Sequence, residues 1–285
     1  MSRVLLFLST NFAVVLVLGF VLNLLGLNQQ GSGSTPFLIM AAVFGMGGSF
    51  ISLWMSKSMA LRSTGARVIE SPNSELERWL VATVHTQAET AGIGKPDVAV
   101  FDSTAPNAFA TGANKNAALV AVSTGLLNNM SRDEVEAVLG HEVSHVANGD
   151  MVTLSLIQGV VNTFVMVFAS IVASALSRGD GRGRGMGYYF AYSIAQMFFG
   201  FLASIVVMWF SRYREFRADE GGAALSTTPK MIAALKRLQS NESSELPASM
   251  AAFGITGSIK QGLQRLLTTH PPLGDRIAAL ESSMH

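Results

Sequence analysis

The sequence predicts an α-helical integral membrane protein with a mainly helical extramembrane domain that contains a small antiparallel β-sheet. Charged residues make up only 14% of the 285 residues and the mean hydropathy is +0.37, both unusual for a soluble enzyme. The absence of cysteine excludes disulfides and thiolate metal sites, and a net charge of +1 gives no support for nucleic-acid binding. Four uncharged apolar runs reach the roughly 20 residues that a membrane helix needs: Val4–Leu27, Pro36–Ser56, Met151–Ser177 and Tyr188–Phe210.

The first apolar run begins close to the N-terminus and is interpreted as a retained membrane helix. A signal peptide is the alternative, but the run is longer than a usual apolar signal region and no convincing cleavage site follows it. The uncharged loop Asn28–Thr35 leads to the second run, after which come Lys57, Arg62 and Arg67. Because positive residues favour the cytoplasmic side, the chain is expected to start inside, loop out and return to the cytoplasm near Lys57.

The polar stretch after the second run is expected to begin a cytoplasmic domain. Residues Asn73–Ala91 have the apolar spacing of an amphipathic helix. Three short apolar segments separated by turn residues predict a small antiparallel sheet: Asp97–Phe101, Asn107–Thr111 and Ala117–Ser123. An exposed edge of this sheet could hold an extended peptide by main-chain hydrogen bonds, and a sheet that only supports the next helix is the alternative.

The stretch Ser131–Asp150, SRDEVEAVLGHEVSHVANGD, carries the most specific pattern in the chain. It opens with a capping box, S-R-D-E, and its apolar spacing then predicts a helix that continues through His145. His141 and His145 are four residues apart and share one helix face, where two neutral imidazoles can bind one zinc ion. Glu142 lies beside the open coordination position and can accept the proton of an attacking water. This pattern predicts a zinc hydrolase rather than a helix with two surface histidines.

The third and fourth apolar runs flank Arg178–Gly187, RGDGRGRGMG, and are interpreted as a membrane hairpin. Two crossings place this tip outside, although its three arginines run against the positive-inside preference. The overall charge bias still favours two crossings, because seven Lys or Arg residues flank the inside ends of the runs. A hairpin that lies partly in the protein or the interface remains the alternative.

A second acidic pattern follows the hairpin in Ser211–Ser226, SRYREFRADEGGAALS. Glu215 and Asp219 are four residues apart on a predicted helix and face the same way. Glu215 is predicted to be the third zinc ligand, with water or substrate in the fourth position. Asp219 is then expected to hydrogen-bond a ligating imidazole and fix its tautomer. Glu220 is the competing carboxylate, and His85 is a weaker rival ligand.

These motifs together carry a family resemblance. HEVSH at His141–His145 with SRYREFRAD at Ser211–Asp219 resembles the HtpX group of membrane zinc endopeptidases, which are gluzincin relatives of the CAAX prenyl proteases. The resemblance extends over nearly the whole chain through NAFATG at Asn107–Gly112, VSTGLL at Val122–Leu127 and HPPLGDRI at His270–Ile277. It implies a mainly helical gluzincin-type zinc protease domain on a membrane anchor.

The expected organisation has four segments. Residues 1–56 hold two membrane helices, and residues 57–150 form the first part of the cytoplasmic protease domain, with the H-E-x-x-H helix. Residues 151–210 form the membrane hairpin. Residues 211–285 complete the protease domain and supply the third zinc ligand.

The resemblance implies one zinc ion per subunit, with His141, His145 and Glu215 as ligands and Glu142 as catalytic base. It implies a heat-shock-associated protease of the bacterial inner membrane, multi-pass, with its active site facing the cytoplasm. Its partners would be the lipid bilayer and misfolded or damaged membrane proteins, which it would hydrolyse in a stress response. A homo-oligomer is left open.

Three further residues take their roles from the resemblance. Asp219 matches an aspartate that orients a ligand, and Asn107 matches a residue proposed to hold the substrate backbone. His270 matches a residue proposed to stabilise the transition state.

Two other classes of function stay open from the residues alone. An intramembrane-cleaving metalloprotease would carry its zinc helix inside an apolar run, whereas His141 lies between Arg132 and Asp150. A non-enzymatic membrane protein with structural zinc would need four protein ligands, and the sequence offers no strong fourth candidate.

Overall fold

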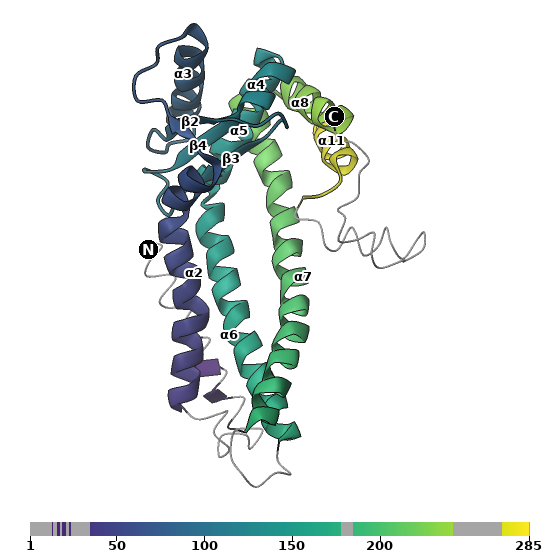
Figure 1. Cartoon of the computed structure of the whole chain (residues 1–285). Coiled ribbons are helices and arrows are strands. Elements are labelled where there is room, and N and C mark those ends of the chain that lie inside the picture. The colour runs from purple at the N-terminus through teal and green to yellow at the C-terminus, as the bar shows by residue number, and fades with distance from the viewer. Residues whose placement is uncertain are drawn as a thin grey trace. The chain divides into compact units, whose positions relative to one another are not determined.

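The computed structural model describes residues 13, 16, 17, 19, 20 and 23, and then residues 35–177, 185–241 and 270–284 (Figure 1). The chain divides into two compact units: residues 1–53 with 152–207, and residues 54–151 with 208–285. Most of the first apolar run, Val4–Leu27, lies outside the described residues, as does most of the predicted hairpin tip, Arg178–Gly187.

The first unit is built from long apolar helices. Among the described residues, three helices are long and apolar enough to cross a membrane: α2 (Thr35–Thr64), α6 (Asp150–Leu176) and α7 (Met186–Leu225). Helices α2 and α6 pack so closely at Gly45 that only glycine fits there. A Cβ atom added to this residue would lie only 2.5 Å from Thr163 Oγ1. Large apolar side chains such as Phe44 and Phe190 stay exposed, as expected of a unit that lipid surrounds.

The second unit contains the predicted catalytic helix, α5 (Arg132–Asn148). The predicted capping box is confirmed: Ser131 Oγ accepts a hydrogen bond from the Glu134 amide, and the Glu134 carboxylate accepts one from the Ser131 amide. The helix ends at Gly149, whose φ of 71° is a left-handed conformation that glycine adopts without strain. Among the described residues, four more helices belong wholly to this unit: α3 (Glu75–Thr90), α4 (Thr124–Asn129), α8 (Thr228–Asn241) and α11 (Leu273–Ser282).

The predicted sheet is present, but it is mixed rather than antiparallel. Its strand order is β1 (Arg67–Val68), β2 (Asp97–Phe101), β4 (Leu119–Ser123) and β3 (Ala108–Thr111). β1 pairs with β2 and β3 with β4 antiparallel, whereas β2 and β4 are parallel. The reason is burial: all five residues of β4 are buried, so β4 takes a central place and the half-buried β3 is left at the edge.

A large hydrophobic core joins the sheet to the helices of the second unit and fixes α5 on several sides. It joins Leu80 and Val84 of α3, Val122 of β4, Leu139 of α5 and Leu235 of α8. Because α5 is buried along most of its length, the histidines near its C-terminal end are held by packing before any ligand is considered.

Candidate metal site

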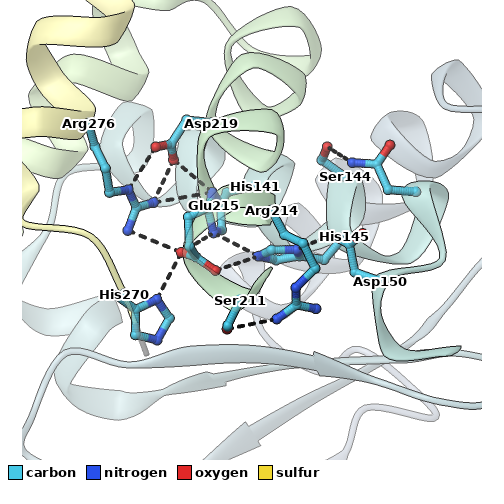
Figure 2. Close-up of polar contacts among 11 residues, drawn as sticks. His141, Ser144, His145, Asp150, Ser211, Arg214, Glu215, Asp219, His270 and Arg276 are labelled. Atoms are coloured by element: carbon cyan, nitrogen blue, oxygen red, sulfur yellow. Dashed lines mark hydrogen bonds and ion pairs between the residues drawn. The ribbon is translucent and has the colours of Figure 1, made fainter. Parts of the chain in front are cut away.

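The three side chains predicted as zinc ligands converge in the second unit (Figure 2). His141 and His145 come from α5, Glu215 comes from α7, and all three are buried. The two Nε2 atoms lie 3.1 Å apart, and the Glu215 oxygens lie 3.3 Å from His145 Nε2 and 3.6 Å from His141 Nε2. Ligand atoms around one tetrahedral zinc would be about 3.3–3.6 Å apart, given metal–ligand distances of about 2.0–2.2 Å. The spacing fits a shared ion.

A buried carboxylate oxygen of Glu215 also supports a metal ion at this position. Glu215 Oε2 is fully buried and accepts no hydrogen bond of good geometry from the described residues. His270 Nδ1 lies 2.8 Å from it and Arg276 Nη1 lies 3.3 Å from it as ion-pair neighbours. Buried carboxylate oxygens normally have a partner, and two imidazoles with one carboxylate suit zinc or another first-row metal. The donor set therefore fits a divalent cation.

Each imidazole is held through its other ring nitrogen by an aspartate. His141 Nδ1 lies 2.9 Å from Asp219 Oδ1, and His145 Nδ1 lies 2.6 Å from Asp150 Oδ2. These contacts favour the proton on Nδ1 and leave Nε2 available to a metal. The contact of Asp219 with an imidazole agrees with the sequence-based prediction. Asp150 was not predicted.

A buried arginine completes the network around Asp219. Arg276, on α11, donates from Nε and Nη2 to the two oxygens of Asp219 at 2.7 and 2.5 Å. This two-point ion pair fixes the plane of the carboxylate that orients His141. Sequence reasoning also missed Arg276, although it lies within the motif HPPLGDRI.

The surrounding carboxylates change the protonation of the two histidines. Burial disfavours the charged form of His145, but the hydrogen bonds to Asp150 and Glu215 outweigh it and raise the pKa of His145 to about 9. Burial likewise opposes protonation of His141, and the contacts with Asp219 and Glu215 raise its pKa. In the metal-free protein both ring nitrogens of His145 are therefore protonated at neutral pH, and a metal ion must displace the proton on Nε2 to bind there.

The other predicted site residues differ in how close they lie to this cluster. Glu142 is half-buried on α5, and its charge contributes to the raised pKa of His145. His270 is exposed, with Nδ1 beside the Glu215 carboxylate. Asn107 is exposed directly before β3, and its backbone N–H donates to Ser123 Oγ at 2.9 Å. No contact in the described ranges joins its side chain to the cluster.

The two rival ligands lie outside the group. His85 Nε2 lies 3.2 Å from the Pro96 carbonyl oxygen, and Glu220 is exposed. Within the part of the chain that the structure describes, the potential metal-binding group consists of His141, His145 and Glu215.

Comparison with known proteins gives a consistent family. Peptidase family M48 matches residues 74–284. Protease HtpX of Xanthomonas campestris pv. campestris (strain B100) is 58% identical over 288 residues, which cover 99% of this chain and 98% of that protein. Protease HtpX of Vibrio vulnificus (strain YJ016) is 59% identical over 289 residues, which cover 99% of this chain and 100% of that protein.

A solved structure shares the fold. The crystal structure of S. mikatae Ste24p matches with a TM-score of 0.64 and 16% sequence identity, covering 94% of this chain and 62% of that one. The chain thus spans less than two thirds of Ste24p, and the likeness concerns the fold alone. The buried histidine–glutamate group, the apolar helices and the relatives together show a membrane metalloprotease. The chain belongs to peptidase family M48, in the HtpX group of that family.

Proposed function

We propose that the chain is a zinc endopeptidase of the bacterial inner membrane that hydrolyses misfolded or damaged membrane proteins at a cytoplasmic active site. The observation that carries the proposal is the convergence of His141, His145 and Glu215, each buried and two of them oriented by aspartates. We assign these three residues as ligands of one zinc ion per subunit. The stress-response role follows from the resemblance to the HtpX group.

The chemistry divides between the ion and the chain. A zinc ion held by these ligands would supply Lewis-acid polarisation of the scissile carbonyl and make water acidic enough to attack near neutral pH. Glu142 accepts the proton of the attacking water and later delivers it to the leaving amine. His270, which is exposed and has Nδ1 beside the Glu215 carboxylate, donates a hydrogen bond to the oxyanion as it forms.

Substrate binding is assigned to the edge of the sheet. β3 is an edge strand, and an edge strand can pair with an extended peptide through main-chain hydrogen bonds. Asn107 directly precedes β3, so its side chain can add a hydrogen bond to the same peptide backbone. Such main-chain recognition gives affinity with little sequence selectivity, which suits an enzyme for damaged proteins.

The membrane topology is argued from charge and aromatic residues. Positive residues cluster after the second and fourth apolar runs, which favours a cytoplasmic location for the segments that follow: Lys57, Arg62, Arg67, Arg212, Arg214 and Arg217. Trp54 and Trp209 are 72% and 63% exposed at the ends of the same runs, as expected of side chains at a membrane interface. Residues 57–150 and 211–285 then form the cytoplasmic protease domain, and residues 1–56 and 151–210 the membrane part.

The proposal is tested by reconstituting the full-length protein in lipid vesicles with zinc and a destabilised multi-pass membrane protein. Cleavage products are sequenced for the wild type and for Glu142→Gln, which serves as the inactive control. We expect cuts in cytoplasmic loops by the wild type alone. Cuts in mid-bilayer segments would favour an intramembrane protease, and zinc binding without any cleavage, even of a soluble unfolded protein, would favour structural zinc.

A further inference from the structure

The first unit contains a hollow that the proteolytic reaction does not use. It has a volume of about 550 Å³ and is lined by residues of α2, α6 and α7, within the range of about 300–1,000 Å³ that is usual for binding sites. Its walls are largely apolar, with Phe44 and Met166 among them. Three polar side chains also reach it, Asn162 from α6 and Ser193 and Gln196 from α7; we call these three residues the amide pocket.

The amide pocket has hydrogen-bonding capacity to spare. Asn162 Oδ1 accepts a hydrogen bond from Gln158 Nε2 at 2.8 Å, but the Asn162 amide nitrogen has no partner among the described residues. Gln196 Nε2 donates to the Tyr192 hydroxyl at 3.2 Å, and within the described ranges its carbonyl oxygen likewise has none. One donor and one acceptor are therefore available to a ligand.

The unpaired hydrogen-bonding groups are costly because they lie inside apolar runs of the chain. Asn162 and Gln196 lie well inside the third and fourth apolar runs, where water is scarce once lipid surrounds the helices. An amide whose hydrogen-bonding groups are not all satisfied is disfavoured in an apolar medium, so a partner that satisfies the remaining group is favoured. A lipid acyl chain has no group that can do so. A membrane helix with an asparagine, glutamine, serine or threonine side chain does.

The described residues of the chain's own first apolar run do not supply this partner. Leu16, Val17 and Phe20 are 56–69% exposed, and none of them lines the hollow. We consider a second protein as the occupant, and the test below distinguishes it from residues 1–34 of the same chain.

We propose that the amide pocket binds a membrane helix of the substrate through a polar side chain that would otherwise face lipid. The proposal rests on the proposed function and names its substrate class. A correctly folded membrane protein buries its polar side chains against neighbouring helices, whereas a misfolded one leaves them exposed. Recognition of such a side chain lets the protease distinguish damaged from intact membrane proteins without reading sequence.

Crosslinking tests the binding step without requiring cleavage. The chain has no cysteine, so Ser193→Cys in the full-length Glu142→Gln protein gives a single reactive site. The probe is a leucine–alanine membrane helix with one central asparagine and a cysteine one turn away, and the matched probe has leucine in place of the asparagine. Ile194→Cys, on the neighbouring exposed position of α7, is the control site.

We expect the asparagine helix to crosslink to Ser193→Cys about threefold to tenfold more than the leucine helix, as one interhelical hydrogen bond predicts. No such preference is expected at Ile194→Cys. Equal yields of the two helices at Ser193→Cys would overturn the proposal. Preferential crosslinking of Ser193→Cys to a cysteine placed in residues 1–34 of the same chain would also overturn it, because the pocket would then be filled from within.

Cleavage tests the selection step. Both helices are fused to the same cleavable cytoplasmic tail, and KM is compared between the wild type and the double variant Asn162→Leu, Gln196→Leu. The wild type should show a KM about threefold to tenfold lower for the asparagine helix, and the double variant should show no difference.

Cleavage of a soluble unfolded protein is the control for folding and for the active site, and the double variant should keep its wild-type rate. If the wild type cuts the soluble substrate but shows the same KM for the two helix fusions, the proposed role of the amide pocket is overturned and the proposed function is not. A wild type that cuts nothing would contradict the proposed function, and the crosslinking result would then decide the pocket separately.

Discussion

The two units treat their polar side chains differently. In the second unit the histidines near the end of α5 sit in a continuous network, in which Asp150 holds His145 and the pair Asp219–Arg276 holds His141. In the first unit the amides of Asn162 and Gln196 are only half satisfied by their neighbours. In the second unit the aspartates fix the geometry of the two imidazoles, and the open acceptor of the network, Glu215 Oε2, is available to a metal ion. In the first unit the open groups of Asn162 and Gln196 are available to a partner. The difference separates groups suited to catalysis from groups suited to binding.

The largest expected effect comes from removing the proposed base while the network stays intact. Glu142→Gln should lower kcat about a hundredfold to ten-thousandfold, because general-base catalysis is lost. The zinc content should stay at about one per chain, since Glu142 is not among the clustered ligands. Parallel measurement of turnover and of metal content checks both parts. A variant that cuts at a near-normal rate would show that another group takes the proton.

The pH dependence of the stability of the metal-free protein tests the protonation state of His145. The pKa of His145 is raised to about 9 in the folded protein, from an ordinary value of 6.5. Its stabilising contribution is therefore complete below pH 6.5 and is lost as the pH rises through about 9; from the shift it amounts to about 3 kcal/mol. Thermal unfolding of the zinc-stripped wild-type protein at pH 6, 7.5 and 9.5 should show a falling midpoint.

Asp150→Asn is the matched control, because it removes the carboxylate that holds the proton on His145. The fall of the unfolding midpoint with pH should then become clearly shallower. A wild-type midpoint that rises with pH over the same interval would contradict the assigned protonation.

Replacing either aspartate by asparagine should weaken zinc binding or activity without abolishing it. Asp219→Asn and Asp150→Asn should each lower zinc affinity or activity about tenfold to a hundredfold, because each holds a ligating imidazole in position. Competition for zinc with a chelator of known affinity measures the change. Asp133→Asn, at an exposed position in the first turn of α5, should change neither quantity. Wild-type affinity in both aspartate variants would mean that packing alone orients the imidazoles.

The smallest effect is expected at the far end of the same helix. Ser131→Ala removes the cap of α5 and should destabilise the second unit by about 1 kcal/mol, with little change in kcat at low temperature. Chemical denaturation followed by tryptophan fluorescence checks the stability. A large loss of kcat at a temperature where the variant is folded would show that the start of α5 is coupled to the metal site.

Sequence reasoning succeeded where the determinants are local. The capping box, the helix that follows it and the spacing of His141 and His145 depend on residues within one or two turns of each other. Glu215 and Asp219 share a helix for the same reason. The meeting of α5 with α7 was a hypothesis from zinc chemistry, which needs a third ligand, and the structure brings these residues together.

The parts that sequence reasoning missed depend on distant contacts. Arg276 reaches Asp219 across 57 residues, a contact that only the packing of α11 creates. Asp150 lies five residues beyond His145 and past the left-handed Gly149, so helical spacing does not align it with the imidazole. The parallel pairing of β2 with β4 depends on which strand is buried most, and the alternation of short apolar segments does not reveal that order.

X-ray absorption at the zinc edge of full-length, zinc-loaded Glu142→Gln tests the central claim most directly. The account predicts one zinc per chain with two imidazole nitrogens at about 2.0–2.1 Å and the remaining ligands oxygen. In Glu215→Ala the oxygen shell should shrink and zinc should be lost under mild chelation. A four-coordinate shell made wholly of protein ligands, or a shell unchanged by Glu215→Ala, would contradict the assignment of this cluster as an open catalytic site.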